Sequence, residues 1–233
     1  MPRRDTLTAD RIVRAAIDLL DDEGLDGLNM RSLAKRLDSA ATAVYWHVKA
    51  KDDLVRLASE AIWHEVGLPD LTTTDWRTAA TAHATGMHAM LTRHPWLVQA
   101  FGSHLLYGTA QARYNDLSLA IYEAAGFTAD AADRAAGAVF TFVLGSALGP
   151  AAQISLNRRL AKNGTDAEKS MADAVARATE TARQFPRLRE RLDTTAAREY
   201  AAAPDSTFEF GLRSLLDGFE RRLAVDGGGP QNS

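Results

Sequence analysis

The segment from residue 41 to residue 51 concentrates side chains that can contact DNA. A helix fits the major groove of B-DNA, which is ~12 Å wide, where donors can bond phosphates while small or polar groups approach base edges. Lys49 and Lys51 place two positive charges at the end of this segment. If it is helical, the side chains that can face DNA are Ala41, Thr42, Ala43, Tyr45, Trp46 and His47.

The surrounding residues predict a helix-turn-helix at 30–48 that would position these side chains. Apolar residues recur at helical spacing in 30–37, and again in 41–48 after a three-residue break. Val44 and Val48 would hold the second helix on the first. A longer amphipathic helix at 8–23 precedes both and completes a small domain.

Each of these residues also has a purely structural interpretation. Tyr45 or Trp46 can be a packed aromatic of the small domain, and Trp46 is the better candidate for that role. A single histidine such as His47 is usually a surface residue, and Lys49 and Lys51 taken alone are solvated charges. Only their position beside the second helix favours DNA contact.

The overall charge does not by itself indicate nucleic-acid binding. The chain has 27 Lys and Arg against 30 Asp and Glu, and residues 1–56 contain ten of each sign. The signs are nevertheless separated, because acidic residues end the first helix while basic residues surround the next two. The distribution of charge therefore matters more for DNA binding than its sum.

Composition also argues against several other functions. The absence of cysteine removes disulfides, thiolate catalysis and cysteine-ligated zinc, and it is compatible with a reducing cytoplasm. The histidines never adopt His-x-x-x-His spacing, and the sequence has no Gly-x-Ser-x-Gly turn or phosphate-binding glycine loop. No apolar run approaches the ~20 residues of a membrane span. We expect a cytoplasmic protein that is not an enzyme, with no metal, cofactor or membrane partner.

Helix-favouring composition and the positions of turn residues predict an all-α chain of two domains. We expect a DNA-binding domain at 1–50, a connecting helix at 51–67, a ligand-binding and dimerisation domain at 68–225 and a disordered tail at 226–233. Proline and glycine divide the large domain into helices at about 75–93, 95–104, 109–125, 129–153, 166–184 and 206–224.

The last predicted helix is more apolar than one core-facing stripe requires, which indicates a partner helix. The side chains expected at this homodimer interface are Phe208, Leu212, Leu215, Leu216 and Phe219. Gly145 and Gly149, one turn apart in the helix predicted at 129–153, would let another helix approach closely. That contact can lie within one chain or between two.

The segment from Met30 to Leu54 closely resembles the DNA-binding head of the tetracycline-repressor (TetR) family, and its most specific part is Tyr45-Trp46-His47-Val48-Lys49-x-Lys51-Asp52. The resemblance implies that Tyr45 and His47 contact phosphate or base and that Lys51 grips a phosphate. It also implies that Arg31 can reach a base edge, although solvation is an equal alternative for this residue. Asp38 stands where the family usually has glycine, and aspartate tolerates a left-handed turn at modest cost. Ala40 and Ala41 replace residues that are often polar or proline, so the operator cannot be inferred from the best-known members.

A weaker resemblance to the same family extends into the large domain. Residues 208–223, Tyr107-Gly108-Thr109 and Ala125-Gly126-Phe127 are similar to the C-terminal domain of the tetracycline-repressor type. The resemblance implies a four-helix dimer interface built by the last helix and the long helix before the variable loop. Leu106 stands where tetracycline-binding members have a histidine that coordinates drug-bound magnesium, so tetracycline-magnesium is not an expected ligand.

The effector pocket is expected among the helices of residues 75–153. Ligand sites are mostly apolar with a few polar groups, and this region supplies both. The candidate lining residues are His88, Trp96, Phe101, His104, Tyr107, Tyr122 and Phe140, each of which is also a candidate for the ordinary core. The sequence does not identify the effector.

The predicted function is that of a ligand-responsive transcriptional regulator. We expect a homodimer that presents two recognition helices ~34–36 Å apart to a palindromic operator in double-stranded DNA, and that a small molecule releases. The alanine-rich second helix leaves an alternative, a helical ligand-binding or protein-interaction module that no longer reads DNA. The sequence does not separate repression from activation.

Overall fold

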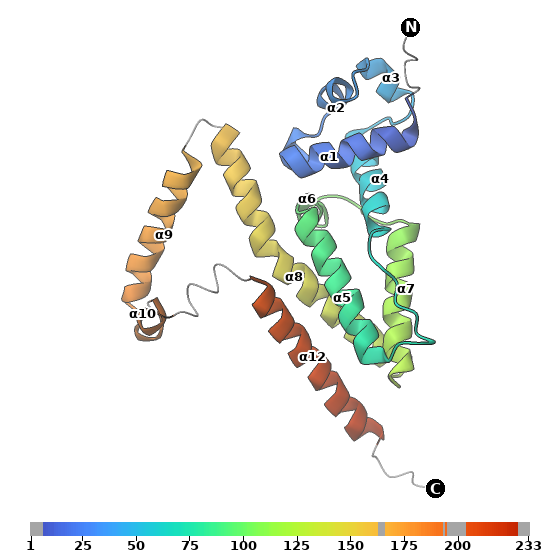
Figure 1. Cartoon of the computed structure of the whole chain (residues 1–233), viewed down its shortest axis with the longest axis vertical. Helices are drawn as coiled ribbons and strands as arrows, with labels where there is room; N and C mark the ends of the chain where they lie inside the picture. Colours follow the sequence, from blue (N-terminus) through green and yellow to red (C-terminus); the bar gives the residue numbers. More distant parts are fainter. Residues whose placement is uncertain (1–6, 163–165, 193, 195–203, 228–233) are drawn as a thin grey trace.

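The computed structural model describes residues 7–162, 166–192, 194 and 204–227, and every regular element within these residues is an α-helix, as predicted (Figure 1). Helices α1 (Ala9–Gly27), α2 (Met30–Arg36) and α3 (Ala41–Tyr45) form a small N-terminal head. The larger part is a helical bundle made of α5 (Trp76–Arg93), α6 (Trp96–Ala100), α7 (Thr109–Ala124), α8 (Ala129–Lys162) and α12 (Pro204–Gly227).

Helix α1 begins and breaks where the sequence predicts. The Thr8 hydroxyl accepts a hydrogen bond from the Arg11 amide and so caps the first turn. Gly24 has a φ of +72°, a left-handed conformation that interrupts the helix before one further short turn. A Cβ at this position would lie 3.3 Å from Nη1 of Arg158, so the break lies against α8.

Helix α4 (Lys51–Trp63) belongs to both the head and the bundle. Its packing partners are α1 in the head and α7 in the bundle. Leu54, Val55, Ala58 and Ile62 are buried along its length. Its last residue, Trp63, packs on Tyr114 of α7 with ring centroids 4.9 Å apart. A shift of α4 within the bundle therefore moves the head.

Helix α8 is longer than predicted, because it continues past the expected end at residue 153 to Lys162, with Pro150 inside it. Proline removes one backbone hydrogen bond, but packing on α5, α6 and α7 supports the helix. By length and composition α8 could also cross a membrane, so the expectation that no apolar run approaches that length is wrong. Its high apolarity comes from alanine, valine, leucine and phenylalanine, and one face packs into the bundle through Ala132, Ala135, Val139, Val143 and Ala147.

Two other boundaries differ from the prediction. Helix α6 ends at Ala100 rather than at residue 104, because the chain then turns through a loop toward α7. Asp226 and Gly227, expected in a disordered tail, form the end of α12, and the rest of that predicted tail lies outside the described residues.

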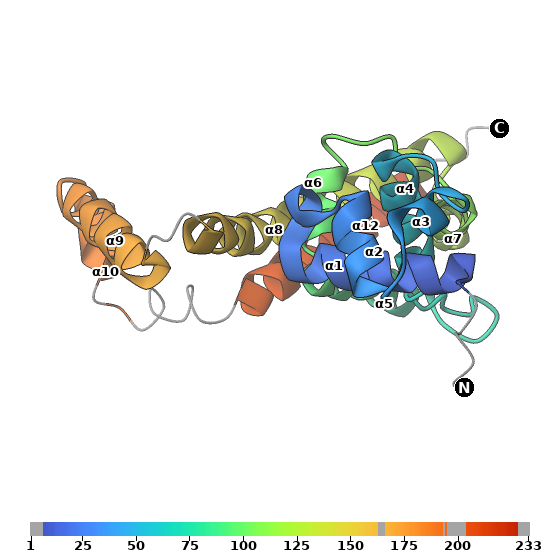
Figure 2. The ribbon, with the colours of Figure 1, turned by 90° about the horizontal axis from the view of Figure 1, so that it is seen from above.

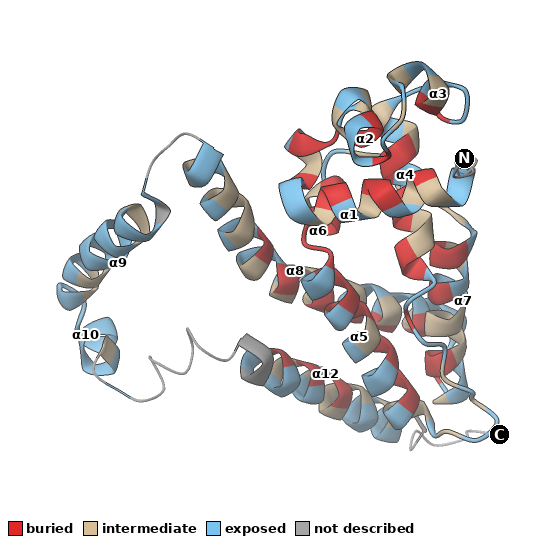
Figure 3. Cartoon of the chain, turned by 45° about the horizontal axis from the view of Figure 1, so that its top comes forward, coloured by how far each residue is buried: buried red, intermediate tan, exposed pale blue. Residues whose placement is uncertain are grey.

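Helices α9 (Ala167–Arg183) and α10 (Pro186–Leu192) stand apart from the bundle (Figure 2). The sequence predicted α9 but not α10. No described residue of either helix is buried, and both are coloured as exposed or intermediate along their described length (Figure 3). Val175, Phe185 and Leu188 are each more than half exposed.

Candidate functional site

The predicted helix-turn-helix is present in the head. The Asn29 side chain accepts a hydrogen bond from the Ser32 amide at 2.9 Å, and the Ser32 hydroxyl accepts one from the Asn29 amide at 3.1 Å. This reciprocal cap starts α2. Asp38 has a φ of +48° in the turn, the left-handed conformation predicted for it. The two helices pack through buried apolar side chains, Leu33, Leu37, Val44 and Val48.

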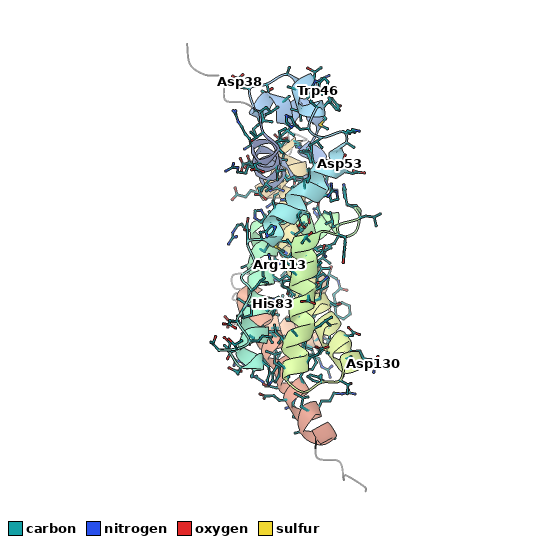
Figure 4. All side chains as sticks on the ribbon, turned by 90° about the vertical axis from the view of Figure 1, so that its right-hand side faces the viewer. Asp38, Trp46, Asp53, His83, Arg113 and Asp130 are labelled. Atoms are coloured by element: carbon teal, nitrogen blue, oxygen red, sulfur yellow. The ribbon has the colours of Figure 1, made fainter. Side chains whose placement is uncertain are left out.

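Helix α3 and the turn after it present polar and aromatic side chains to solvent at one end of the molecule (Figure 4). Trp46 is 89% exposed and Tyr45 is 51% exposed, and Thr42 and His47 are exposed as well. The interpretation of Trp46 as a packed aromatic is therefore wrong. The helix ends at Tyr45 instead of residue 48, so Trp46 and His47 project from the turn that follows.

The basic residues around α3 differ in what they contact. Lys51 Nζ donates a hydrogen bond to the carbonyl oxygen of Leu25 at 2.6 Å, which ties the start of α4 to the segment after the break in α1. The resemblance implied a phosphate contact for Lys51, whereas in the structure its ammonium group bonds the head's own backbone. Arg31 and Lys49 are exposed.

The residues predicted to line an effector pocket do not form one site. Trp96 is buried beside the head, where its indole N–H donates to Asp21 Oδ1 at 2.9 Å. His104 and Tyr107 lie in the loop before α7, and Tyr107 is 73% exposed. His88 stacks on Phe208 with ring centroids 4.0 Å apart and lines a groove of about 810 Å³ between α5 and α12.

The remaining three predicted lining residues are in or beside the core of the bundle. Tyr122 is buried and packs edge-on against Phe127 and Phe219. Phe101 and Phe140 contact each other edge-on with centroids 5.8 Å apart. Phe101 also contacts Trp63 at 6.4 Å, so this pair adjoins the interior where α4 meets α7.

A group of polar side chains that the sequence analysis missed lies between α4, α5 and α7. We call Glu60, Trp63, His83 and Gln111 the polar cluster. The buried atoms Glu60 Oε2, Trp63 Nε1, His83 Nδ1 and Gln111 Oε1 have no hydrogen-bond partner within the described residues. Buried polar atoms are normally bonded, so several unpartnered ones in a single region indicate that water or a ligand completes them.

Contacts around Tyr114 hold the polar cluster together. His83 stacks on the Tyr114 ring at 3.8 Å, and Trp63 packs on the same ring at 4.9 Å. Oε1 of Glu60 accepts a hydrogen bond from the Ala110 amide at 2.8 Å, next to Gln111. Burial lowers the pKa of His83 to about 4, so the ring is neutral near pH 7. In the sequence, Glu60 and Trp63 are three residues apart, as are Gln111 and Tyr114. This spacing places each pair on one face of its helix and is the signal that could have indicated the cluster.

The predicted dimer residues divide between the inside and the outside of the protomer. Phe208, Leu212 and Leu216 are buried against the protomer's own bundle, so their apolar character does not require a partner chain and that part of the prediction is wrong. Leu215 and Phe219 are half-buried. The outward faces instead carry Phe210 of α12, which is 74% exposed, and Leu148 of α8, which is 59% exposed.

Two family models match this head and this bundle. Residues 12–58 match bacterial regulatory proteins of the tetR family, and residues 68–223 match the tetracyclin repressor-like C-terminal domain. The chain belongs to the TetR family. As a TetR-family member it is a ligand-responsive, DNA-binding transcriptional regulator, as the sequence analysis predicted.

Individual relatives agree with this TetR-family assignment. An HTH-type transcriptional regulator of Saccharopolyspora erythraea is 39% identical over 140 residues, which are 60% of this chain and 59% of that protein. The class A tetracycline repressor of Escherichia coli is 30% identical over 230 residues, covering 94% of this chain and 93% of that one. The structure of ActR from Streptomyces coelicolor in complex with actinorhodin superposes with a TM-score of 0.69 at 25% identity, covering 92% and 96% of the two chains. These relatives are regulators rather than enzymes.

Proposed function

We propose that the protein is a homodimeric repressor that binds a palindromic operator and leaves it when a small molecule enters the bundle. The observation that carries the proposal is the surface of α3. Thr42, Tyr45, Trp46 and His47 are exposed on a helix and turn that Val44 and Val48 anchor in the head. An indole that is 89% exposed has no role in the head's core and is free to contact DNA.

The proposed DNA contacts follow from exposure. Thr42, Ala41 and Ala43 of α3 face the base edges, and Tyr45, Trp46 and His47 bond or pack on the sugar-phosphate backbone. Arg31 and Lys49 are the exposed cations beside α3 and meet phosphates. Lys51 acts indirectly, because its hydrogen bond to Leu25 fixes α4 against α1 and thereby orients α3.

The proposed dimer interface is the outer face of α8 and α12. Exposed Gly145 and Gly149 on α8 allow close approach of a partner helix, and exposed Leu148 supplies apolar surface between them. Phe210, with half-buried Leu215 and Phe219, continues this surface on α12. Two copies joined here form a bundle of four helices, as is typical of the family.

The proposed effector site is the polar cluster, with Phe101 and Phe140 as its apolar wall. Its unpartnered atoms include two acceptor oxygens and one indole N–H, so the effector must offer both donors and acceptors. Aromatic rings line the same region, which suits a flat, hydroxylated molecule. Actinorhodin, which is bound in the ActR structure, is a suitable first probe.

The first experiment is selection of bound fragments from random DNA, followed by salt-dependent binding of the enriched fragment. A palindromic consensus with a steep loss of affinity on adding salt supports a dimeric, phosphate-gripping regulator. Failure of a folded dimer to enrich any sequence would point instead to a protein-interaction module.

A second experiment tests the effector site. Thermal shift on adding actinorhodin is compared for the wild type and Gln111→Leu, with Thr81→Leu as a matched control, since Thr81 is exposed on α5. We expect the shift to be lost only in the Gln111 variant. Equal shifts in all three proteins would place the bound molecule elsewhere.

A further inference from the structure

His94 joins the head to the bundle by bridging two carboxylates. The residue directly follows α5 and is only 4% exposed. Its Nδ1 lies 2.8 Å from Oδ1 of Asp21 on α1, and its Nε2 lies 3.3 Å from Oε1 of Glu65, just after α4. One imidazole therefore contacts the head on one side and the end of the connecting helix on the other.

The groups around this bridge come from every helix that meets there. Trp96 of α6 donates its indole N–H to the same Asp21 oxygen at 2.9 Å. Arg93 of α5 pairs with Glu65, and Arg158 of α8 donates to the backbone carbonyl of Asp21. His94 therefore sits between two carboxylates, and a guanidinium pairs with the Glu65 carboxylate on one side and bonds the Asp21 backbone on the other.

The bridge depends on the charge of His94. A neutral imidazole has a single N–H and can donate to only one carboxylate, whereas an imidazolium donates to both. Burial lowers the pKa of His94, but the hydrogen bonds and charges of Asp21 and Glu65 outweigh burial and raise it above its ordinary 6.5. The two-sided bridge is therefore complete at low pH and loses one side as the pH rises through that raised value.

Helix α1 packs on α4 and α6, but its C-terminal end does not pack closely on α8. A crevice of about 430 Å³ lies beside the bridge, between the end of α1 and the C-terminal part of α8. Its lining includes Glu23 and Asp26 from the head and Arg159 and Lys162 from α8. Because packing leaves this space open, the polar bridge adds to the packing of α1 on α4 and α6 in fixing the head's angle.

We propose that His94 is a positioning residue that locks the head onto the bundle through Asp21 and Glu65, and that its proton is a second input to DNA binding beside the effector. A shift of α5 or α6 would pull directly on this bridge. Loss of the proton would free the head in the same way. The effect on operator binding rests on the proposed function. The fixing of the head on the bundle does not, because it is a property of one chain.

The locking is tested by a distance measurement that needs no DNA. The chain has no cysteine, so Lys35→Cys on the head and Asn115→Cys on α7, both exposed, can carry a pair of spin labels. Labelled chain is mixed with excess unlabelled chain, and the distance distribution is recorded at about pH 6 and about pH 9, on either side of the ordinary histidine pKa. We expect a narrow distribution at the lower pH that broadens at the higher pH.

Variants assign the effect to the bridge. His94→Gln should give the broad distribution at both pH values, and the isosteric Asp21→Asn and Glu65→Gln should do so even if the His94 variant folds poorly. Asp130→Asn is the control, because Asp130 pairs with Arg134 at the end of the molecule opposite the head (Figure 4). Narrow distributions in all folded variants at both pH values overturn the proposal.

The consequence for DNA is measured with a fragment selected from random sequence. Operator affinity of the wild type should change by about fivefold or more between the two pH values, the size of an ordinary coupling between sites. His94→Gln should remove this difference. If the distance distribution changes with pH and operator affinity does not, His94 positions the head but does not control DNA binding.

Discussion

The structure and the family resemblance give Lys51 different roles: an internal hydrogen bond in the structure and a phosphate contact by resemblance. Its ammonium donates to the Leu25 carbonyl at 2.6 Å, and the side chain is only partly exposed. Replacing Lys51 by Met keeps an unbranched apolar side chain, one atom shorter, and removes the donor. The Leu25 carbonyl then lacks this bond, and α4 loses its tie to α1.

The expected cost can be worked out from this one contact. Hydrogen bonds to charged groups contribute about 1.5–3 kcal/mol, and partial exposure places this one near the lower end. In a chain of this size each kcal/mol lowers the melting temperature by about 2–4 °C, so Lys51→Met should melt about 3–6 °C below the wild type. Lys49→Met is the matched control, because Lys49 is exposed and its loss should change stability by no more than about 0.5 kcal/mol.

Thermal unfolding followed by circular dichroism measures the loss of stability, and salt-dependent operator binding measures the loss of a phosphate contact. Lys49→Met should lower the salt slope by about one phosphate contact with no change in melting, whereas Lys51→Met should show the loss of stability. The reasoning is refuted if Lys51→Met melts with the wild type and shows the reduced salt slope, because Lys51 is then a phosphate ligand.

Three further outcomes follow from the same structure. Trp46→Ala should weaken operator binding by about tenfold, a loss of ~1.4 kcal/mol, and change stability by less than about 0.5 kcal/mol; a clear loss of stability in urea would contradict the exposure of the indole. Leu148→Asp should convert the dimer to monomer in sedimentation, whereas Leu105→Asp in an exposed loop should not, and two dimeric variants would exclude this face of α8. His83 is neutral in the fold while the unfolded chain titrates near pH 6.5, so stability should fall by up to about 3 kcal/mol as the pH drops from 6.5 to 4. His83→Gln should remove that pH dependence, and an unchanged curve would show that His83 is not its source.

The head could be predicted from the sequence because its determinants are local. Thr8 and Asn29 cap the helices that follow them, Gly24 breaks α1, and Asp38 adopts the left-handed turn. Each of these depends on a few neighbouring residues, and periodicity alone identified Val44 as buried.

The effector region could not be predicted in the same way, because its residues meet through tertiary packing. Aromatic residues of 75–153 suggested a pocket, yet Trp96 bonds the head and Tyr107 points into solvent. Glu60 and Gln111 lie 51 positions apart in the sequence, and only the packing of α4 on α7, where Glu60 bonds the Ala110 amide, brings them near each other. Similarly, Phe208 was expected to face a partner chain because periodicity identifies an apolar face without saying which chain covers it.

The shared helix α4 also determines how this protein can be recombined with its relatives. Its buried residues serve two cores, so a chimaera cut at Lys51 would give the head of one protein the connecting helix of another. A cut in the loop before Trp76 keeps α1 and α4 together, but the acceptor must then match the contacts of Trp63 with Tyr114 and of Asp21 and Glu65 with His94. Exchange of DNA specificity at this loop should therefore succeed where the acceptor has these contacts. Because Glu60 and Trp63 of the polar cluster are transferred with the head, the effector response of the fusion should depend on both parents.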